Sequence, residues 1–156
     1  MAIIRGMNKT DYKEINETLK ALVKDVPYTM TNLANASALL NEKLEGINWV
    51  GFYTIKDDQL VLGPFQGKVA CTMIAFGRGV CGTAVQMDST QVVPDVHQFK
   101  GHIACDSASN SEIVIPMHRK GRVFGVLDID SPLFNRFSEE DREGLEEFVR
   151  ILESVI

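Results

Sequence analysis

EIVIPMHRKGRVFGVLDI, residues 112–129, is the stretch that decides the fold of this chain of 156 residues. Two β-branched runs, residues 112–117 and 122–129, lie on either side of a tight polar turn at residues 118–121. Short apolar runs separated by a turn that contains glycine are typical of an antiparallel β-hairpin. The sequence therefore predicts a sheet built around this hairpin.

Four other segments have strand signals, because they are short, β-branched or aromatic, and bounded by turn residues. They are residues 47–55, 60–62, 68–74 and 90–93. After the third of them, Gly77, Gly79 and Gly82 interrupt the pattern and predict a loop with hinge or turn positions and a short helix. We expect this segment, which carries Cys81, to be mobile.

Helical spacing of apolar residues predicts three further helices. They cover residues 12–23, residues 31–44 and a closing segment that begins at Ser138. Pro27 ends the first helix and Gly46 is well placed to end the second. Ser138 with Asp141 three residues later is an acid-containing form of the capping box. The combination predicts an α+β sandwich, with helices packed on one face of a mainly antiparallel sheet and ligand loops over the other.

Length and composition limit the possible functions. A chain of 156 residues that is 45% hydrophobic suits one compact domain, residues 1–156. The net charge of −5 and the lack of any basic run argue against a nucleic-acid or anionic-membrane surface. No stretch approaches the roughly 18–20 apolar residues of a membrane span, and the N-terminus lacks signal-peptide features. We therefore expect a cytoplasmic protein with reduced thiols, which an odd count of three cysteines fits.

Cys105 is the most informative single residue of the chain. Buried cysteines are usually small core hydrophobes, but this one is followed by residues typical of an exposed loop or capped turn. These are Asp106, Ser107, Ser109 and Asn110. Two more cysteines, Cys71 and Cys81, lie upstream in polar or glycine-rich contexts. Such a set favours reversible redox chemistry, in which one thiolate attacks and another cysteine resolves the oxidised product.

A zinc site is the rival interpretation of three cysteines. Structural zinc sites pair ligands two to four residues apart, whereas Cys71, Cys81 and Cys105 are separated by 10 and 24 positions. His102, three residues before Cys105, is the one histidine placed to complete such a set. We expect no metal on this spacing.

Three acidic residues are predicted to meet on the hairpin. Asp128 and Asp130 lie two apart on a strand, so their side chains share one face. Aspartate is depleted from strand interiors, so an ordinary turn explains Asp130 better than Asp128. Glu112 begins the neighbouring strand and faces them across the pair. Converging carboxylates repel unless a cation or shared protons relieve them, so we expect raised pKa values and a site for a substrate ammonium.

An aromatic wall is predicted beside these acids. Trp49, the only tryptophan, and Tyr53 lie four residues apart on one strand and therefore share a face with Gly51. Core packing is the plain alternative for Trp49. Together with a small glycine, the two rings form a flat apolar surface beside the acids.

Six segments, in this order, make the chain similar to a known family. They are residues 49–53 (WVGFY), 70–83, 95–97 (DVH), 101–112, 125–132 and 137–141 (FSEED). Over these segments the chain resembles a stand-alone GAF domain of the free methionine-(R)-sulfoxide reductase family. The resemblance implies a six-stranded antiparallel GAF sheet, a homodimer, no cofactor and a role in oxidative stress. It also implies reduction of free L-methionine-(R)-sulfoxide with thioredoxin as the electron donor.

The resemblance also assigns roles to residues. Cys105 is the expected nucleophile, and Cys71 is the expected principal resolving cysteine. Cys81 is a second resolver or a relay, and the sequence leaves the choice between these two cysteines open. Glu112, Asp128 and Asp130 are expected to act in catalysis and, with Trp49 and Tyr53, in substrate binding.

The expected reaction is attack of the Cys105 thiolate on the sulfoxide sulfur while a carboxylic acid protonates the oxygen. The resulting sulfenic acid condenses to a disulfide that thioredoxin reduces. A GAF sensor that binds a small molecule without chemistry is the alternative. An acidic pocket, however, suits a nucleotide phosphate badly.

Overall fold

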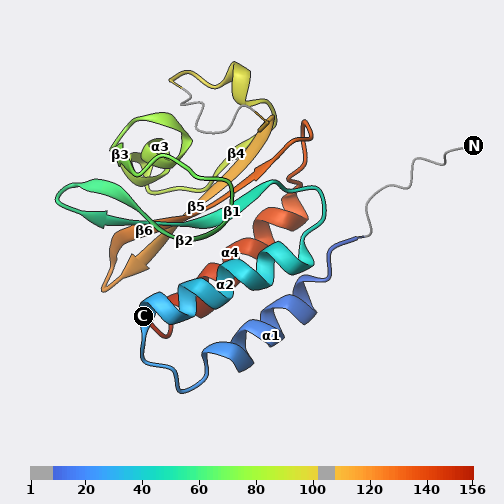
Figure 1. The fold of residues 1–156 in the computed structure, drawn as a ribbon, viewed down its shortest axis with the longest axis vertical. Coiled ribbons are helices and arrows are strands. Elements are labelled where there is room, and N and C mark those ends of the chain that lie inside the picture. Colours follow the sequence, from blue (N-terminus) through green and yellow to red (C-terminus); the bar gives the residue numbers. More distant parts are fainter. Residues whose placement is uncertain (1–8, 102–107) are drawn as a thin grey trace, which may run out of the picture.

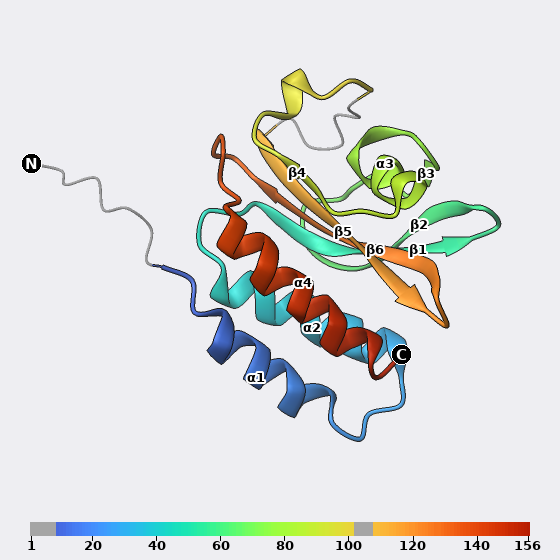
Figure 2. The same ribbon diagram turned by 180° about the vertical axis from the view of Figure 1, so that it is seen from behind.

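A computed structural model describes residues 9–101 and 108–156. One antiparallel sheet separates three long helices on one face from a short helix on the other (Figures 1 and 2). The strands are β1 (Trp49–Lys56), β2 (Gln59–Gly67), β3 (Met73–Ala75), β4 (Gln91–Val93), β5 (Ser111–Arg119) and β6 (Arg122–Ser131). Their order is β3-β2-β1-β6-β5-β4, and all neighbours are antiparallel, which confirms the predicted six-stranded α+β fold.

Within the described residues, four α-helices complete the fold. They are α1 (Tyr12–Val23), α2 (Thr29–Lys43), α3 (Gly79–Met87) and α4 (Glu139–Glu153). A short 3₁₀ helix, η1 (Val96–Gln98), precedes the undescribed residues 102–107. At the start of α4, Ser138 and Asp141 form the reciprocal hydrogen bonds of a capping box, as predicted. None of the helices within the described ranges is long and apolar enough to cross a membrane.

The central hairpin fixes the register of the sheet. Its turn contains only Lys120 and Gly121, with φ values of 53° and 77°. Positive φ at both central residues is the signature of the type I′ turn, whose twist matches that of the flanking strands. Beyond this turn, Val114 pairs with Asp128 and Glu112 pairs with Asp130. The pairing shifts by one residue at a β-bulge between Met117 and His118, so the turn and the bulge together determine which side chains of β5 meet those of β6.

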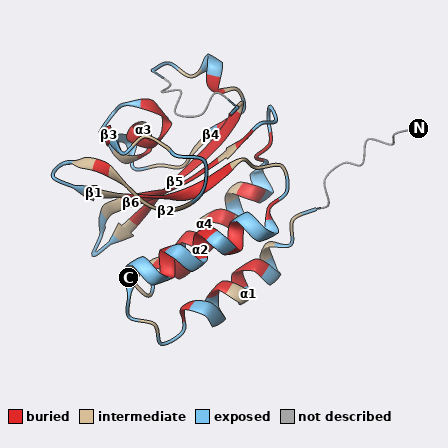
Figure 3. Cartoon of the chain, in the orientation of Figure 1, coloured by how far each residue is buried: buried red, intermediate tan, exposed pale blue. Residues whose placement is uncertain are grey.

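Alternation along the strands separates two packing layers. Ile113, Ile115, Leu127 and Ile129 point toward the long helices and belong to the larger apolar core. The buried faces of α2 and α4 pack against this layer, and α1 packs against these two helices (Figure 3). Residues at the intervening positions face the short helix α3, on the other side of the sheet. One face thus supplies most of the core, and the other face is available for a site.

The third strand is shorter than predicted. It covers Met73–Ala75, and residues 68–72 form an irregular connection to β2 instead of continuing the strand. Side chains from β1 bond the carbonyl groups of this connection, since Trp49 Nε1 donates to Lys68 O over 3.0 Å and Tyr53 Oη donates to Cys71 O over 2.9 Å. In a continuous strand, these carbonyl groups would accept hydrogen bonds from a neighbouring strand. Here they accept from side chains, which hold the connection over the sheet.

His118 ties three elements together at the far end of the hairpin. Its Nε2 lies 2.6 Å from Asp88, which caps the C-terminus of α3, and its Nδ1 lies 2.9 Å from Glu153, the last residue of α4. Burial works against the charged imidazolium, but the hydrogen bonds to Asp88 and Glu153 outweigh it and raise the pKa of His118. The charged ring therefore stabilises the packing of both helices against β5.

We expect His118→Gln to lower the melting temperature by about 1–4 °C near pH 5.5, the effect of partly exposed ion pairs. Because the folded pKa of His118 is raised, its contribution is fully present below the unfolded pKa and is lost as pH rises through the folded pKa. The difference from the unmutated protein should therefore shrink toward about pH 9. Thermal unfolding monitored by circular dichroism measures it. His97→Gln is the matched control, because that ring contacts the neutral Asn110. A loss of the same size at both pH values would show that the ion pairs contribute nothing.

Candidate active site

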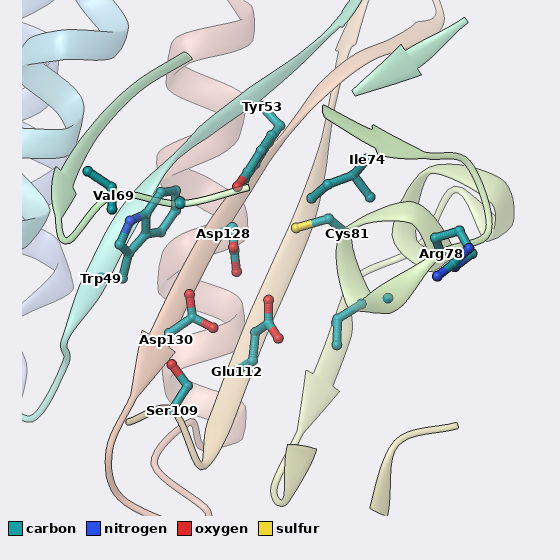
Figure 4. A pocket seen from close by; sticks show the side chains of 13 residues that line it. Trp49, Tyr53, Val69, Ile74, Arg78, Cys81, Ser109, Glu112, Asp128 and Asp130 are labelled. Carbon is teal, nitrogen blue, oxygen red and sulfur yellow. The ribbon is translucent and has the colours of Figure 1, made fainter. Parts of the chain in front are cut away.

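A pocket lies between the sheet and α3, on the face opposite the long helices (Figure 4). From the sheet, β1 contributes Trp49 and Tyr53, β5 contributes Glu112, and β6 contributes Asp128 and Asp130. The first turn of α3 and the connection at residues 69–70 close the opposite side. The structure thus brings the predicted acidic and aromatic residues to one pocket.

Strand register explains how the acids meet. On β6, Asp130 lies between Trp49 of β1 and Glu112 of β5, while Asp128 lies between Gly51 and Val114. The three carboxyl groups therefore project from adjacent positions of one sheet face, and they point into the pocket (Figure 4). Glu112 and Asp128 are each only 6% exposed. Acidic side chains are almost never buried to this extent unless they are paired or protonated.

Burial governs the electrostatics of this cluster. It raises the pKa of Glu112, and the negative charges of Asp128 and Asp130 raise it further. Burial also raises the pKa of Asp128, although hydrogen bonds from its neighbours act in the opposite direction. One oxygen of Asp128, Oδ1, is buried and has no hydrogen-bond partner among the described residues. The pocket therefore favours bound protons or a bound cation.

The aromatic wall is larger than the sequence predicts. The Trp49 ring stacks on Tyr53, with centroids 6.0 Å apart, and on Phe65 of β2, with centroids 5.2 Å apart. Phe65 pairs with Gly51, where a Cβ atom would lie 2.3 Å from the Cβ of Phe65. Gly51 therefore gives Phe65 the room to extend the wall. Phe65 gave no signal of its own, because its strand was predicted to end at residue 62.

The described cysteines differ sharply in environment. Cys71 is half-buried in the connection between β2 and β3 and is disulfide-bonded, whereas Cys81 is a free thiol that is 4% exposed. Burial raises the pKa of Cys81, and the nearby Asp128 and Glu112 carboxylates raise it further. Cys105, the predicted nucleophile, lies outside the described residues.

The short helix predicted in this segment is confirmed as α3, but the prediction that Cys81 lies on the loop was wrong. Cys81 belongs to the first turn of α3 and packs in the smaller apolar cluster beside the pocket. At the next position, Gly82, a Cβ atom would lie 2.5 Å from Ala75 O. The glycine therefore permits close contact between α3 and β3. Gly79, with a φ of 60°, begins the helix. The glycines are thus packing and start positions rather than hinges.

The pocket includes residues that the sequence did not single out for it. They are Val69, Ala70, Ile74, Arg78, Gly79, Val80 and Ser109. Arg78 supplies a cationic group to the lining and lies on the far side of Cys81 from the carboxylates (Figure 4). The glycines on either side of Arg78 indicated a turn. The one sequence signal that Arg78 lies at the pocket was its position as a basic residue three before Cys81.

We expect Glu112→Gln to stabilise the protein at neutral and alkaline pH by about 1–2 kcal/mol, as is typical of relieving a charge that an active site strains. The folded pKa of Glu112 is raised, so the stability that its proton confers is fully present below the unfolded pKa and is lost as pH rises through the folded pKa. The uncharged glutamine avoids this loss. Urea unfolding at about pH 4.5 and about pH 8 should show the gain at the higher pH.

Glu143→Gln, at an exposed position of α4, is the matched control for the Glu112 substitution. It should leave the pH dependence of the unfolding free energy unchanged. If Glu112→Gln gave no gain in unfolding free energy at the higher pH, the repulsion between the carboxylates would already be compensated in the native protein. The cluster would then not lower the stability.

Comparison with known proteins agrees with the fold and identifies the family. Residues 33–156 match the GAF domain family. The chain is 56% identical over 151 residues to the free methionine-R-sulfoxide reductase of Escherichia coli, and the match covers 96% of this chain and 92% of that protein. It is 47% identical over 129 residues to the protein of the same name from Saccharomyces cerevisiae, covering 78% of this chain and 72% of that protein.

Solved structures give the same result. The fRMsr of Staphylococcus aureus in complex with substrate matches with a TM-score of 0.93 and 50% identity, over 96% of this chain and 98% of that one. The free methionine-R-sulfoxide reductase of Neisseria meningitidis, also in complex with its substrate, matches with a TM-score of 0.89 and 47% identity, over 92% and 87%. The chain therefore belongs to the free methionine-(R)-sulfoxide reductase family of GAF domain proteins.

Proposed function

We propose that this protein reduces free L-methionine-(R)-sulfoxide to methionine. The observation that carries the proposal is the carboxyl cluster of buried Glu112, buried Asp128 and half-buried Asp130, which faces the aromatic wall in one pocket. The named activity of the relatives from Escherichia coli and Saccharomyces cerevisiae supports it. A non-catalytic GAF sensor was the alternative from sequence, but this acidic pocket repels phosphate groups.

The cluster accounts for the choice of a free amino acid. A substrate ammonium placed among the carboxylates supplies the cation that relieves their repulsion. The methyl sulfoxide group then lies against the Trp49 and Tyr53 rings, which give it an apolar surface. A residue inside a polypeptide lacks the ammonium and leaves buried carboxylates unpaired, which is costly.

The chemical step needs one thiolate and one proton. The Cys105 thiolate attacks the sulfoxide sulfur, and a protonated carboxyl group of the cluster donates its proton to the oxygen. The sulfur–oxygen bond breaks as the hydroxyl group transfers to the Cys105 sulfur, so methionine leaves and Cys105 becomes a sulfenic acid. The raised pKa of Glu112 supports the presence of a protonated acid at neutral pH. The sulfoxide is thus reduced by two electrons and the thiolate is oxidised by two.

Cys71 is the proposed principal resolving cysteine. Its thiol condenses with the sulfenic acid to form a disulfide and water, and thioredoxin reduces that disulfide by exchange. Three observations support Cys71: it is disulfide-bonded, it is half-buried, and Tyr53 holds its backbone carbonyl. Cys81 is buried in a helix with a raised pKa, which suits a slower resolver or a relay. A cytoplasmic homodimer of single-domain subunits, active against oxidative stress, completes the proposal.

We expect strong discrimination between free and N-acetylated methionine-(R)-sulfoxide. The acetyl compound should lower kcat/KM by about tenfold to a hundredfold or more, because it removes the charge that pairs with the buried carboxylates. Methionine release measured by chromatography, with dithiothreitol as reductant, gives both values. The methyl ester of the substrate is the matched control, since it keeps the ammonium and is expected to lose much less. Equal activity on the acetyl compound would refute recognition of the ammonium, and a preference for the S epimer would refute the proposed substrate.

The three cysteines should give distinct single-turnover results. Cys105→Ser should release no methionine. Cys71→Ser should release about one equivalent per subunit and then slow with thioredoxin, because the sulfenic acid lacks its principal partner. Cys81→Ser should still form a disulfide between peptides that contain Cys71 and Cys105, detected by mass spectrometry after alkylation. A link found only between Cys81 and Cys105 in the unmutated protein would reverse the assignment of the resolver.

A further inference from the structure

We propose that Cys81, Glu112 and Asp128 form a binding site for a sulfur-preferring divalent metal ion such as Zn²⁺. The Cys81 sulfur and one carboxylate oxygen from each acid all lie within 4.8 Å of one another. The three residues come from α3, β5 and β6, and all line the same pocket. Figure 4 shows the Cys81 sulfur directed toward the carboxylates.

The unpartnered oxygen of Asp128 is the second observation that points to a cation. Asp128 is 6% exposed, and its Oδ1 has no hydrogen-bond partner among the residues that the structure describes. Leaving a buried carboxylate oxygen unsatisfied costs free energy, which a coordinated metal ion would recover. The neighbouring Glu112 presents its carboxyl group to the same pocket. A cation bound between these carboxyl groups would therefore be favourable.

The donor set selects the kind of metal. Ca²⁺ and Mg²⁺ prefer oxygen ligands only, whereas a thiolate with two carboxylates suits Zn²⁺. Ligand atoms around a tetrahedral zinc lie about 3.3–3.8 Å apart, so movements of about 1 Å assemble the site. Three protein ligands leave a fourth position open toward the pocket, as in catalytic zinc sites.

Binding changes protonation but transfers no electrons. The metal displaces the proton of the Cys81 thiol and any protons held between the carboxyl groups, so affinity rises with pH. The spacing that disfavours zinc concerns Cys71, Cys81 and Cys105 as joint ligands. This site uses one cysteine and two residues of the hairpin, which are distant from it along the chain.

Metal and substrate compete for the same carboxylates. If the proposed function holds, Zn²⁺ is therefore a competitive inhibitor that also blocks Cys81 as a thiol. Metal binding itself does not depend on the proposed function, because it needs only the described side chains. A binding assay without sulfoxide consequently tests the site even if the protein has no reductase activity.

The experiment uses the reduced full-length chain and Co²⁺ as a spectroscopic probe. We expect one Co²⁺ per chain, a sulfur-to-cobalt charge-transfer band in the near ultraviolet, and displacement by Zn²⁺. Cys81→Ala should abolish the band, and Asp128→Asn should weaken Zn²⁺ binding by at least about a hundredfold. Cys71→Ser is the matched control and should keep the band. Circular dichroism checks that each variant is folded.

Two results would overturn the proposal. One is the absence of a charge-transfer band in the reduced, unmutated protein. The other is a band that persists in Cys81→Ala and disappears in Cys71→Ser, which would place the metal on another thiol. Should Cys81→Ala fail to fold, Asp128→Asn decides alone, since unchanged Zn²⁺ affinity in that variant would exclude the site.

Discussion

The gathering of three carboxyl groups on one sheet face, two of them buried, is the constraint on which the rest of the structure depends. Like charges at adjacent positions of a sheet repel strongly in a poorly solvated pocket. The protein keeps them there because Glu112, Asp128 and Asp130 are fixed by strand pairing rather than by flexible loops. The free energy that opposes this arrangement is offset by the apolar core on the opposite face. The site is therefore strained toward binding a proton or a cation.

Most of the sheet could be predicted from sequence because its signals are local. The Lys120-Gly121 turn and the alternation of β5 and β6 predict the hairpin. The register that brings Glu112 next to Asp130 also needs the one-residue shift between Met117 and His118, which the turn alone does not predict. The same reasoning placed Trp49 and Tyr53 on one face. The hairpin and the shared face of Trp49 and Tyr53 follow from a recognisable turn and a strand period of two.

The segment around Cys81 could not be predicted in this way, because its structure depends on distant contacts. Glycine is a poor helix former, so Gly77, Gly79 and Gly82 predicted a loop and a short helix, with Cys81 on the loop. The helix forms there because Gly82 lets α3 approach Ala75 closely and its N–H donates to Arg78 O. The connection that carries Cys71 departs from a strand for a similar reason, since Tyr53 bonds its carbonyl from another element. Tertiary packing overrides local propensity at both cysteines.

Strand alternation is what allows stability and chemistry to coexist in so small a domain. Ile113, Leu127 and Ile129 point to the helices, while their neighbours Glu112, Asp128 and Asp130 point to the pocket. A slip of one residue in the pairing would exchange the two sets, burying the acids under the helices and exposing the core. Such a slip is therefore strongly disfavoured. Burial of the apolar residues stabilises the correct register, and this register holds the acids in place. The charged site is positioned by the hydrophobic face behind it.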